Sequence, residues 1–160
     1  MKKRNSIRFM VQGASIAALY IALTFLSSAL GLSNGVIQVR FSEALCVLPI
    51  FTPAAIPGLF VGCFLANILT GSVLVDVVFG SLATLLGAIL TRVLRRKKFW
   101  AVLPPILSNA LIIPFVLKFA YGVEGSIWFF MVTVGVCEII SCGVLGSLLM
   151  MDLKKRGNIF

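Results

Sequence analysis

Long uncharged apolar runs alternate with short polar or charged links along this chain of 160 residues. The first run, residues 9–30, holds 22 residues without a charge. About 20 apolar residues are enough for one helix to cross the hydrocarbon core of a bilayer. The pattern therefore predicts an all-α membrane protein whose helices are joined by short links.

The longest uncharged run lies between Glu43 and Asp76 and has 32 residues. As one helix it would be about 48 Å long, against a hydrocarbon core of about 30 Å. Pro49, Pro53 and Pro57 interrupt the run, and a proline inside a helix removes a hydrogen bond and clashes with the preceding turn. The run is thus either one broken helix or two passages with a tight turn near residues 52–57.

The distribution of basic residues favours two passages. Of the 14 Lys and Arg residues, twelve lie in three clusters next to apolar runs, at residues 2–8, 92–98 and 154–156. Basic residues concentrate on the cytoplasmic side of membrane proteins, and two passages place all three clusters on one side. We therefore predict a single membrane domain in the plasma membrane, a six-transmembrane-helix bundle with cytoplasmic termini and spans near residues 9–30, 42–52, 54–70, 73–94, 99–118 and 127–153.

Composition supports the same class of protein. The chain is 60% hydrophobic and only 12% charged, whereas soluble domains are about 25% charged. The net charge of +9 is explained by the three clusters, so we expect no nucleic-acid partner.

In this topology most of the remaining charges gather away from the clusters. They fall on the outer side or within the last span: Arg40, Glu43, Asp76, Lys118, Glu124 and Glu138. A channel would distribute polar groups along its whole path. The asymmetry instead predicts a pocket that opens on the outer side.

Glu138 is the most informative single residue, because an ionisable group within a span normally faces the bundle interior or a water-filled cavity. It could accept hydrogen bonds from the N–H groups of a ligand or pair with a ligand cation. Alternatively, it could form an internal ion pair with Arg40 or Lys118, or be a protonated buried acid.

Other polar residues have two interpretations each. Asp76 begins the fourth span, where a carboxylate could cap the helix or contact a ligand. Asn67 and Asn109 could hold helices together or contact a ligand, because an amide in a membrane needs a partner. Arg40 with Glu43 could form a salt bridge that closes the first outer link.

Aromatic and small residues add further candidates. Trp128 begins the sixth span, where it could belong to an interfacial belt or stack on a flat heterocycle. Small residues recur every fourth position in the first span, at Ala14, Ala18 and Ala22. Such a face could pack within the bundle or dock a partner helix. Gly58 and Gly62 form a GxxxG pattern, a weak signal for close helix contact.

Catalysis has little support in the sequence. The chain has no histidine, no nucleophile elbow and no phosphate-binding loop of the GxxxxGK[ST] type. The cysteines at 46, 63, 137 and 142 lie inside apolar runs and have no metal-binding spacing, so we interpret them as buried apolar residues. We expect no enzymatic activity, no metal and no cofactor.

Two stretches carry a family resemblance. The run VIQVRFSEALCVLPIFTPAAIPGLFVGCFLANIL at residues 36–69, followed by VDVVFGSLATLLGA at residues 75–88, resembles the QueT-type substrate-binding (S) subunits of energy-coupling factor (ECF) transporters. The resemblance implies a six-helix subunit that captures a queuosine precursor, a 7-deazaguanine, from outside. It also implies a transmembrane coupling subunit and two ATPase subunits as partners. In the wider family an AxxxA pattern on the first helix meets the coupling subunit, and Ala14, Ala18 and Ala22 match that pattern.

The chemistry of a 7-deazaguanine assigns roles to these candidates. Its ring N–H and exocyclic NH₂ lie side by side, and one carboxylate can accept both; Glu138 is the first choice and Asp76 the second. Asn67 and Asn109 could read the remaining edge, and Trp128 or Phe41 could stack on the ring.

The first outer link, residues 38–43, has a separate expected role. We interpret it as a lid that Arg40 and Glu43 close, and Glu43 is also available to a cationic 7-aminomethyl group. Another flat vitamin or nucleobase is the alternative substrate. A scaffold whose polar residues only hold helices together is the alternative function.

Overall fold

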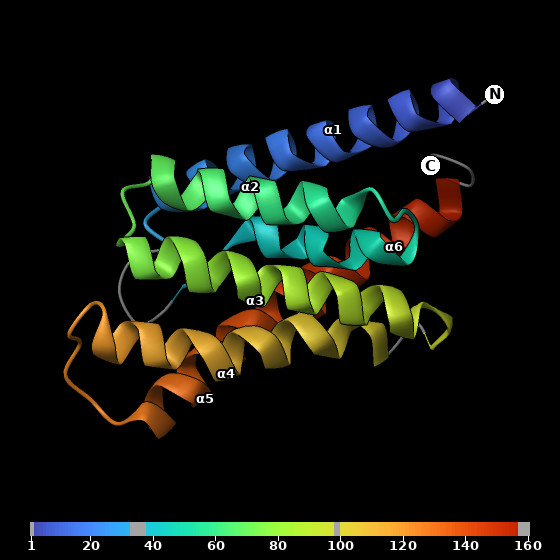
Figure 1. Ribbon diagram of the computed structural model, residues 1–160. Helices are drawn as coiled ribbons and strands as arrows, with labels where there is room; N and C mark the ends of the chain where they lie inside the picture. The colour runs from blue at the N-terminus through green and yellow to red at the C-terminus, as the bar shows by residue number, and fades with distance from the viewer. Residues whose placement is uncertain (1, 33–37, 98–99, 157–160) are drawn as a thin grey trace.

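The structure is a computed structural model that describes residues 2–32, 38–97 and 100–156 (Figure 1). All regular secondary structure in these residues is helical, which confirms the predicted class. The α-helices are α1 (Lys2–Ala29), α2 (Ala55–Leu69), α3 (Leu74–Val93), α4 (Leu103–Phe119), α5 (Ile127–Glu138) and α6 (Gly146–Arg156). Three segments are 3₁₀-helices, namely η1 (Phe41–Ile50), η2 (Leu94–Arg96) and η3 (Trp100–Val102), and a π-helix, η4 (Ile139–Leu145), joins α5 to α6.

Successive segments run back and forth between the two ends of the bundle (Figure 1). The start of α1, the turn after α3 and the end of α6 lie at one end, and the links after α1, α2 and α4 lie at the other. The described residues of all three basic clusters therefore lie at the first end, which we call the basic end. The run between Glu43 and Asp76 forms two helical segments, η1 and α2, that run in opposite directions.

The 3₁₀-helix η1 occupies the centre of the bundle, where it contacts α1, α2, α3, α6 and η4. Seven of its ten residues are buried. A 3₁₀-helix rises about 2.0 Å per residue against 1.5 Å in an α-helix, so this short segment reaches further across the bundle. Its last carbonyl oxygens lack helical partners, and the Arg92 side chain donates to those of Pro49 at 3.0 Å and Ile50 at 3.2 Å.

Glycines allow α1 and α2 to pack backbone against backbone. A Cβ added to Gly58 would lie 2.7 Å from the carbonyl oxygen of Gly13, and one added to Gly62 would lie 3.0 Å from Cα of Ala17. This contact confirms the weak GxxxG signal. It also separates two faces of α1, because Gly13 and Ala17 are buried whereas Ala14, Ala18 and Ala22 are exposed.

The last passage changes its helical form in the middle. Glu138 ends α5, and the π-helix η4 begins at the next residue. Such widened turns occur mostly as single insertions and frequently at functional sites. Beyond η4, Gly146 lets α6 approach η1, since an added Cβ would lie 2.9 Å from Cγ1 of Val47.

Polar and apolar side chains are sorted as in a membrane protein. Glu43 is 3% exposed and Asn67 is 1% exposed, whereas Leu74 is 77% exposed on the outside. Within the described residues, four helical stretches are long and apolar enough to cross a membrane: Asn5–Ala29, Leu74–Arg96, Trp100–Phe119 and Ile127–Arg156. η1 and α2 are shorter apolar helices, so the count of six spans and the side on which the termini lie stay predictions.

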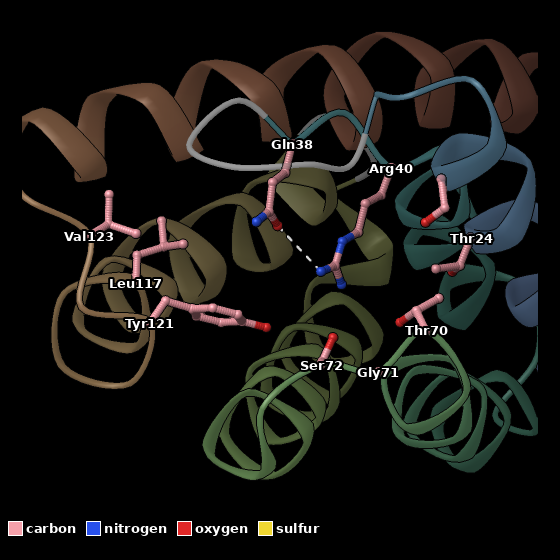
Figure 2. Close-up of a pocket in the computed structure, with 10 residues that line it drawn as sticks. Thr24, Gln38, Arg40, Thr70, Gly71, Ser72, Leu117, Tyr121 and Val123 are labelled. Carbon is pink, nitrogen blue, oxygen red and sulfur yellow. Dashed lines mark hydrogen bonds between the residues drawn. The ribbon is translucent and has the colours of Figure 1, made fainter.

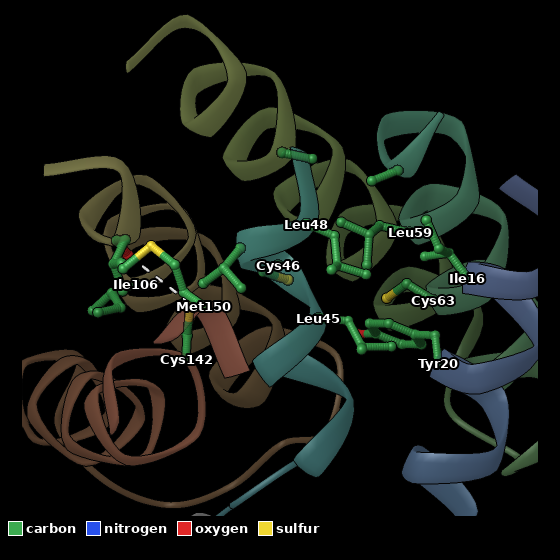
Figure 3. Packing of buried hydrophobic residues seen from close by; sticks show 14 of the residues in the cluster. Ile16, Tyr20, Leu45, Cys46, Leu48, Leu59, Cys63, Ile106, Cys142 and Met150 are labelled. Atoms are coloured by element: carbon green, nitrogen blue, oxygen red, sulfur yellow. Dashed lines mark hydrogen bonds between the residues drawn. The ribbon is translucent and has the colours of Figure 1, made fainter. Parts of the chain in front are cut away.

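The apolar core lies on both sides of η1 (Figure 3). In that view Cys46 of η1 separates Ile106, Cys142 and Met150 from Leu59 and Cys63. The four cysteines are free and buried, as their apolar surroundings in the sequence predicted.

Candidate substrate-binding site

Six predicted residues come together in the interior, in the half of the bundle away from the basic end. They come from six different segments: the link before η1, η1 itself, α2, α3, α4 and α5. We call them the polar cluster: Arg40, Glu43, Asn67, Asp76, Asn109 and Glu138. Five of them are buried and Arg40 is half-buried.

Glu138 has one oxygen engaged and one without a partner. Its Oε1 atom accepts a hydrogen bond of 2.7 Å from Nδ2 of Asn109. Its Oε2 atom is fully buried and has no hydrogen-bond partner, and neither has the hydroxyl of nearby Ser141. Buried polar atoms are nearly always hydrogen-bonded, so this oxygen has the capacity to accept a further hydrogen bond. The predicted alternative, an ion pair of Glu138 with Arg40 or Lys118, is not formed.

Glu43 differs, because side chains of the protein already occupy both of its oxygens. Tyr20, which is fully buried on α1, donates to Oε1 at 2.5 Å, and the Cys46 thiol donates to Oε2 at 3.1 Å. The predicted salt bridge between Arg40 and Glu43 is wrong. Both residues are described, and no nitrogen of Arg40 lies within 4.0 Å of a carboxylate oxygen of Glu43. The Glu43 carboxylate instead ties η1 to α1.

Arg40 points into the bundle and binds amide oxygens. Its Nη1 atom donates to Oδ1 of Asn67 at 3.2 Å and its Nη2 atom donates to Oε1 of Gln38 at 3.3 Å (Figure 2). Burial lowers the pKa of Arg40 more than any one neighbour raises it, but Asp76 and the other acidic groups around it together raise it by more, so the net shift is upward. Arg40 is therefore a permanent cation among three carboxyl groups.

Asp76 lies in the first turn of α3, as predicted, but its side chain caps no backbone N–H. Its Oδ2 atom accepts a hydrogen bond of 3.0 Å from the hydroxyl of Tyr121, in the link after α4. Partial burial raises the pKa of Tyr121, so this phenol stays a donor at neutral pH. Gly80 leaves room beside the acid, because an added Cβ would lie 3.1 Å from Oδ1 of Asp76.

The sequence argument missed both tyrosines. Tyr20 lies in an apolar run and Tyr121 in the link after α4, where neither the charge pattern nor the spacing distinguishes them. The available signal was polarity alone, since a phenol hydroxyl within a membrane span needs a partner.

Two cavities meet at the polar cluster. The outer one has a volume of about 230 Å³ and is lined by Thr24, Ser28, Gln38, Arg40, Thr70, Gly71, Ser72, Leu117, Tyr121 and Val123 (Figure 2). The inner one has a volume of about 30 Å³, and its lining includes Glu43, Asn109 and Glu138. Gln38 and Arg40 line both, so their side chains lie between the outer cavity and Glu138.

Two predicted aromatic contacts lie elsewhere. Trp128 is 77% exposed at the start of α5 and lines neither cavity. Phe41 is half-buried, and its backbone N–H donates to the Ser27 hydroxyl at 2.8 Å, which anchors the link to α1. In the described part of the chain, no group of three or more acidic, Cys or His side chains is placed to hold a metal ion.

These features define a class: a multi-pass helical membrane protein with an occluded polar site near one end of its bundle. Comparison with known families is consistent with this class. A family model described as QueT transporter matches residues 10–155, and the chain belongs to that family.

A curated relative shares part of the sequence. The queuosine precursor transporter QueT of Lactococcus lactis subsp. cremoris (strain MG1363) is 34% identical over 102 residues. The aligned residues cover 61% of this chain and 60% of that protein, less than two thirds of its length. No solved structure matches the chain.

Proposed function

We propose that this chain is the substrate-binding subunit of an energy-coupling factor transporter and captures a queuosine precursor of the 7-deazaguanine class from outside the cell. The observation that carries the proposal is the buried, unpartnered Oε2 atom of Glu138 beside a cavity, in a chain of the QueT transporter family. The name of the relative from Lactococcus lactis supports the substrate class.

Glu138 suits the donor edge of a deazaguanine. The ring N–H and the exocyclic NH₂ point the same way, and a carboxylate accepts such a pair in two parallel hydrogen bonds. Asn109 holds Oε1 at 2.7 Å and so orients the carboxylate before the ligand arrives. The proposal assigns Asn67 and Asp76 to the edges nearer the outer cavity, and it assigns no contact to Trp128.

The balance of charge favours a cationic precursor. The polar cluster contains three carboxyl groups and one guanidinium. Burying a carboxylate is costly unless a cation or several hydrogen-bond donors accompany it. A 7-aminomethyl group carries such a cation, whereas a 7-cyano group does not. We therefore expect the 7-aminomethyl precursor to bind more tightly than the 7-cyano precursor.

Binding requires movement of Arg40 and Gln38 in this proposal. Ligand pockets usually have volumes of about 300 to 1,000 Å³; the outer cavity, at about 230 Å³, falls just short of that range. The inner cavity, at about 30 Å³, has room for about one water molecule. Displacing the Arg40 and Gln38 side chains would join the two cavities and give the ligand access to Glu138. The link at residues 38–43 would then close over the bound ligand as a lid.

Energy for uptake would come from other chains. The proposal assigns ATP hydrolysis to two partner ATPases and no enzymatic activity to this chain. The exposed Ala14, Ala18 and Ala22 face of α1 supplies a flat surface for the transmembrane coupling subunit. That face is free because α1 packs on α2 through Gly13 and Ala17 instead.

Calorimetric titration of the detergent-purified chain tests the proposal. We expect saturable binding of 7-aminomethyl-7-deazaguanine, weaker binding of 7-cyano-7-deazaguanine and no binding of adenine. Circular dichroism verifies that the sample remains helical. A helical sample that binds no nucleobase and no vitamin would contradict the proposal and favour the scaffold function.

A further inference from the structure

An apolar groove between α3 and α4 opens beside the basic turn that joins these helices. Its volume is about 540 Å³, and it is lined by Leu86, Leu90, Leu94, Trp100, Leu103, Pro104, Leu107, Ser108, Leu111 and Ile112. Leu94 and Trp100 of this lining flank the turn, and Arg95, Arg96 and Lys97 lie between them in the chain. Three basic residues therefore belong to the turn at this end of the groove, which we call its mouth.

The three basic side chains at the mouth are exposed. The one ion pair found in the described part of the chain joins Arg156 to Asp152 at 2.9 Å, so Arg95, Arg96 and Lys97 have no acidic partner there. Neighbouring Arg92 is engaged differently, because it donates to the carbonyl oxygens of Pro49 and Ile50. The positive charge at the mouth is thus left for a partner outside the chain.

The dimensions and position fit one class of partner. The α4 part of the groove runs over ten residues from Leu103 to Ile112, which is about 15 Å of helix and comparable to much of an acyl chain. Trp100 is 62% exposed at the basic end of the groove, and tryptophan concentrates at the headgroup level of membranes. Basic residues at a helix end attract anionic lipid headgroups.

We infer that the chain binds one anionic phospholipid here, with the phosphate held by Arg95, Arg96 and Lys97 and an acyl chain lying in the groove. This inference is independent of the proposed substrate. The site uses residues at the basic end of α3 and α4, and the polar cluster plays no part in it.

Native mass spectrometry of the purified chain tests the lipid site. The probes are phosphatidylglycerol, phosphatidylcholine with the same acyl chains, and inorganic phosphate. We expect one retained phosphatidylglycerol, weaker retention of phosphatidylcholine and no retained phosphate. Replacing Arg95, Arg96 and Lys97 by Gln should weaken phosphatidylglycerol binding on the order of a hundredfold, since each basic residue near the headgroups contributes about a factor of five.

Two further variants separate this site from general attraction to anions. The triple replacement of Lys154, Lys155 and Arg156 by Gln removes the same number of cations at the same end, and it should leave phosphatidylglycerol binding unchanged. Leu107→Trp should fill the groove and weaken binding with every basic residue in place. Equal losses in the two triple variants would overturn the inference, as would equal retention of both lipids or undiminished binding by Leu107→Trp.

Discussion

At the scale of single residues, the acidic side chains of the polar cluster have different roles. Glu43 accepts from Tyr20 and Cys46, so it holds helices together. Glu138 has a free oxygen, so it is available to a ligand. Sequence reasoning found both residues, because an ionisable group in an apolar run is conspicuous. It could not separate their roles, since the roles depend on which neighbours the fold brings within hydrogen-bond distance.

Tyr20→Phe should destabilise the protein. The substitution removes the donor to Glu43 Oε1 and leaves a buried oxygen with one partner fewer, which costs about 1–3 kcal/mol in the free energy of unfolding. Tyr121→Phe is the matched control, because Tyr121 is 41% exposed and lines the outer cavity, where solvent can replace the donor that Asp76 loses; this change should cost less than about 0.5 kcal/mol. Thermal unfolding in detergent measures both changes. Equal shifts in the two variants would argue against a structural role for Glu43.

Arg40→Gln should change substrate preference. Removal of the internal cation leaves the three carboxyl groups unbalanced, so the ratio of affinities for the 7-aminomethyl and 7-cyano precursors should rise about tenfold, a difference of about 1.4 kcal/mol. Lys118→Gln removes an exposed charge near the same end and should leave the ratio unchanged. Titration with both ligands measures it. Loss of both affinities in Arg40→Gln would instead indicate that Arg40 contacts the ligand directly.

At the scale of elements, the sequence predicted where helices begin and end more closely than what kind they are. The helices η1 (Phe41–Ile50) and α2 (Ala55–Leu69) end within two residues of the ranges 42–52 and 54–70 that were predicted from the sequence, because the prolines mark where the run breaks. The 3₁₀ form of η1 and the π-helix at Ile139–Leu145 were not predicted. Both forms depend on packing against neighbouring segments, to which hydropathy is insensitive.

Gly58→Ala should weaken the contact between α1 and α2. The new methyl group would lie 2.7 Å from the carbonyl oxygen of Gly13, and forcing backbones apart in a packed interior costs about 1–3 kcal/mol. Gly135→Ala on α5 is the control, because its nearest neighbour would be a side-chain atom at 3.8 Å; it should be neutral or slightly stabilising. The melting temperatures of the two variants test the contact, and an unchanged Gly58→Ala protein would speak against it.

At the scale of the whole molecule, polar chemistry and positive charge occupy opposite ends of one bundle. The links after α1, α2 and α4 lie away from the basic end (Figure 1), so our proposal has the substrate enter from the side opposite the basic clusters. The sequence predicted this arrangement from the basic clusters alone, because two passages between Glu43 and Asp76 place all three clusters on one side.

Cysteine labelling in intact cells tests the orientation of the bundle in the membrane. The four native cysteines are at most 5% exposed and should react slowly with a membrane-impermeant maleimide. Glu124→Cys, in the link after α4, should be labelled from outside, whereas Lys155→Cys should be labelled only after the cells are permeabilised. Labelling of Lys155→Cys in intact cells would contradict the cytoplasmic placement of the basic end.

The central claim is that Glu138 receives the substrate, and the affinity of Glu138→Gln for 7-aminomethyl-7-deazaguanine tests it most directly. Replacing the carboxylate by an amide removes charge-assisted hydrogen bonds worth about 1.5–3 kcal/mol, so the dissociation constant should rise about 10- to 150-fold. Glu124→Gln, which alters an exposed acid in the link after α4, should bind like the unaltered chain. Equal affinity of Glu138→Gln and the unaltered chain would contradict the claim.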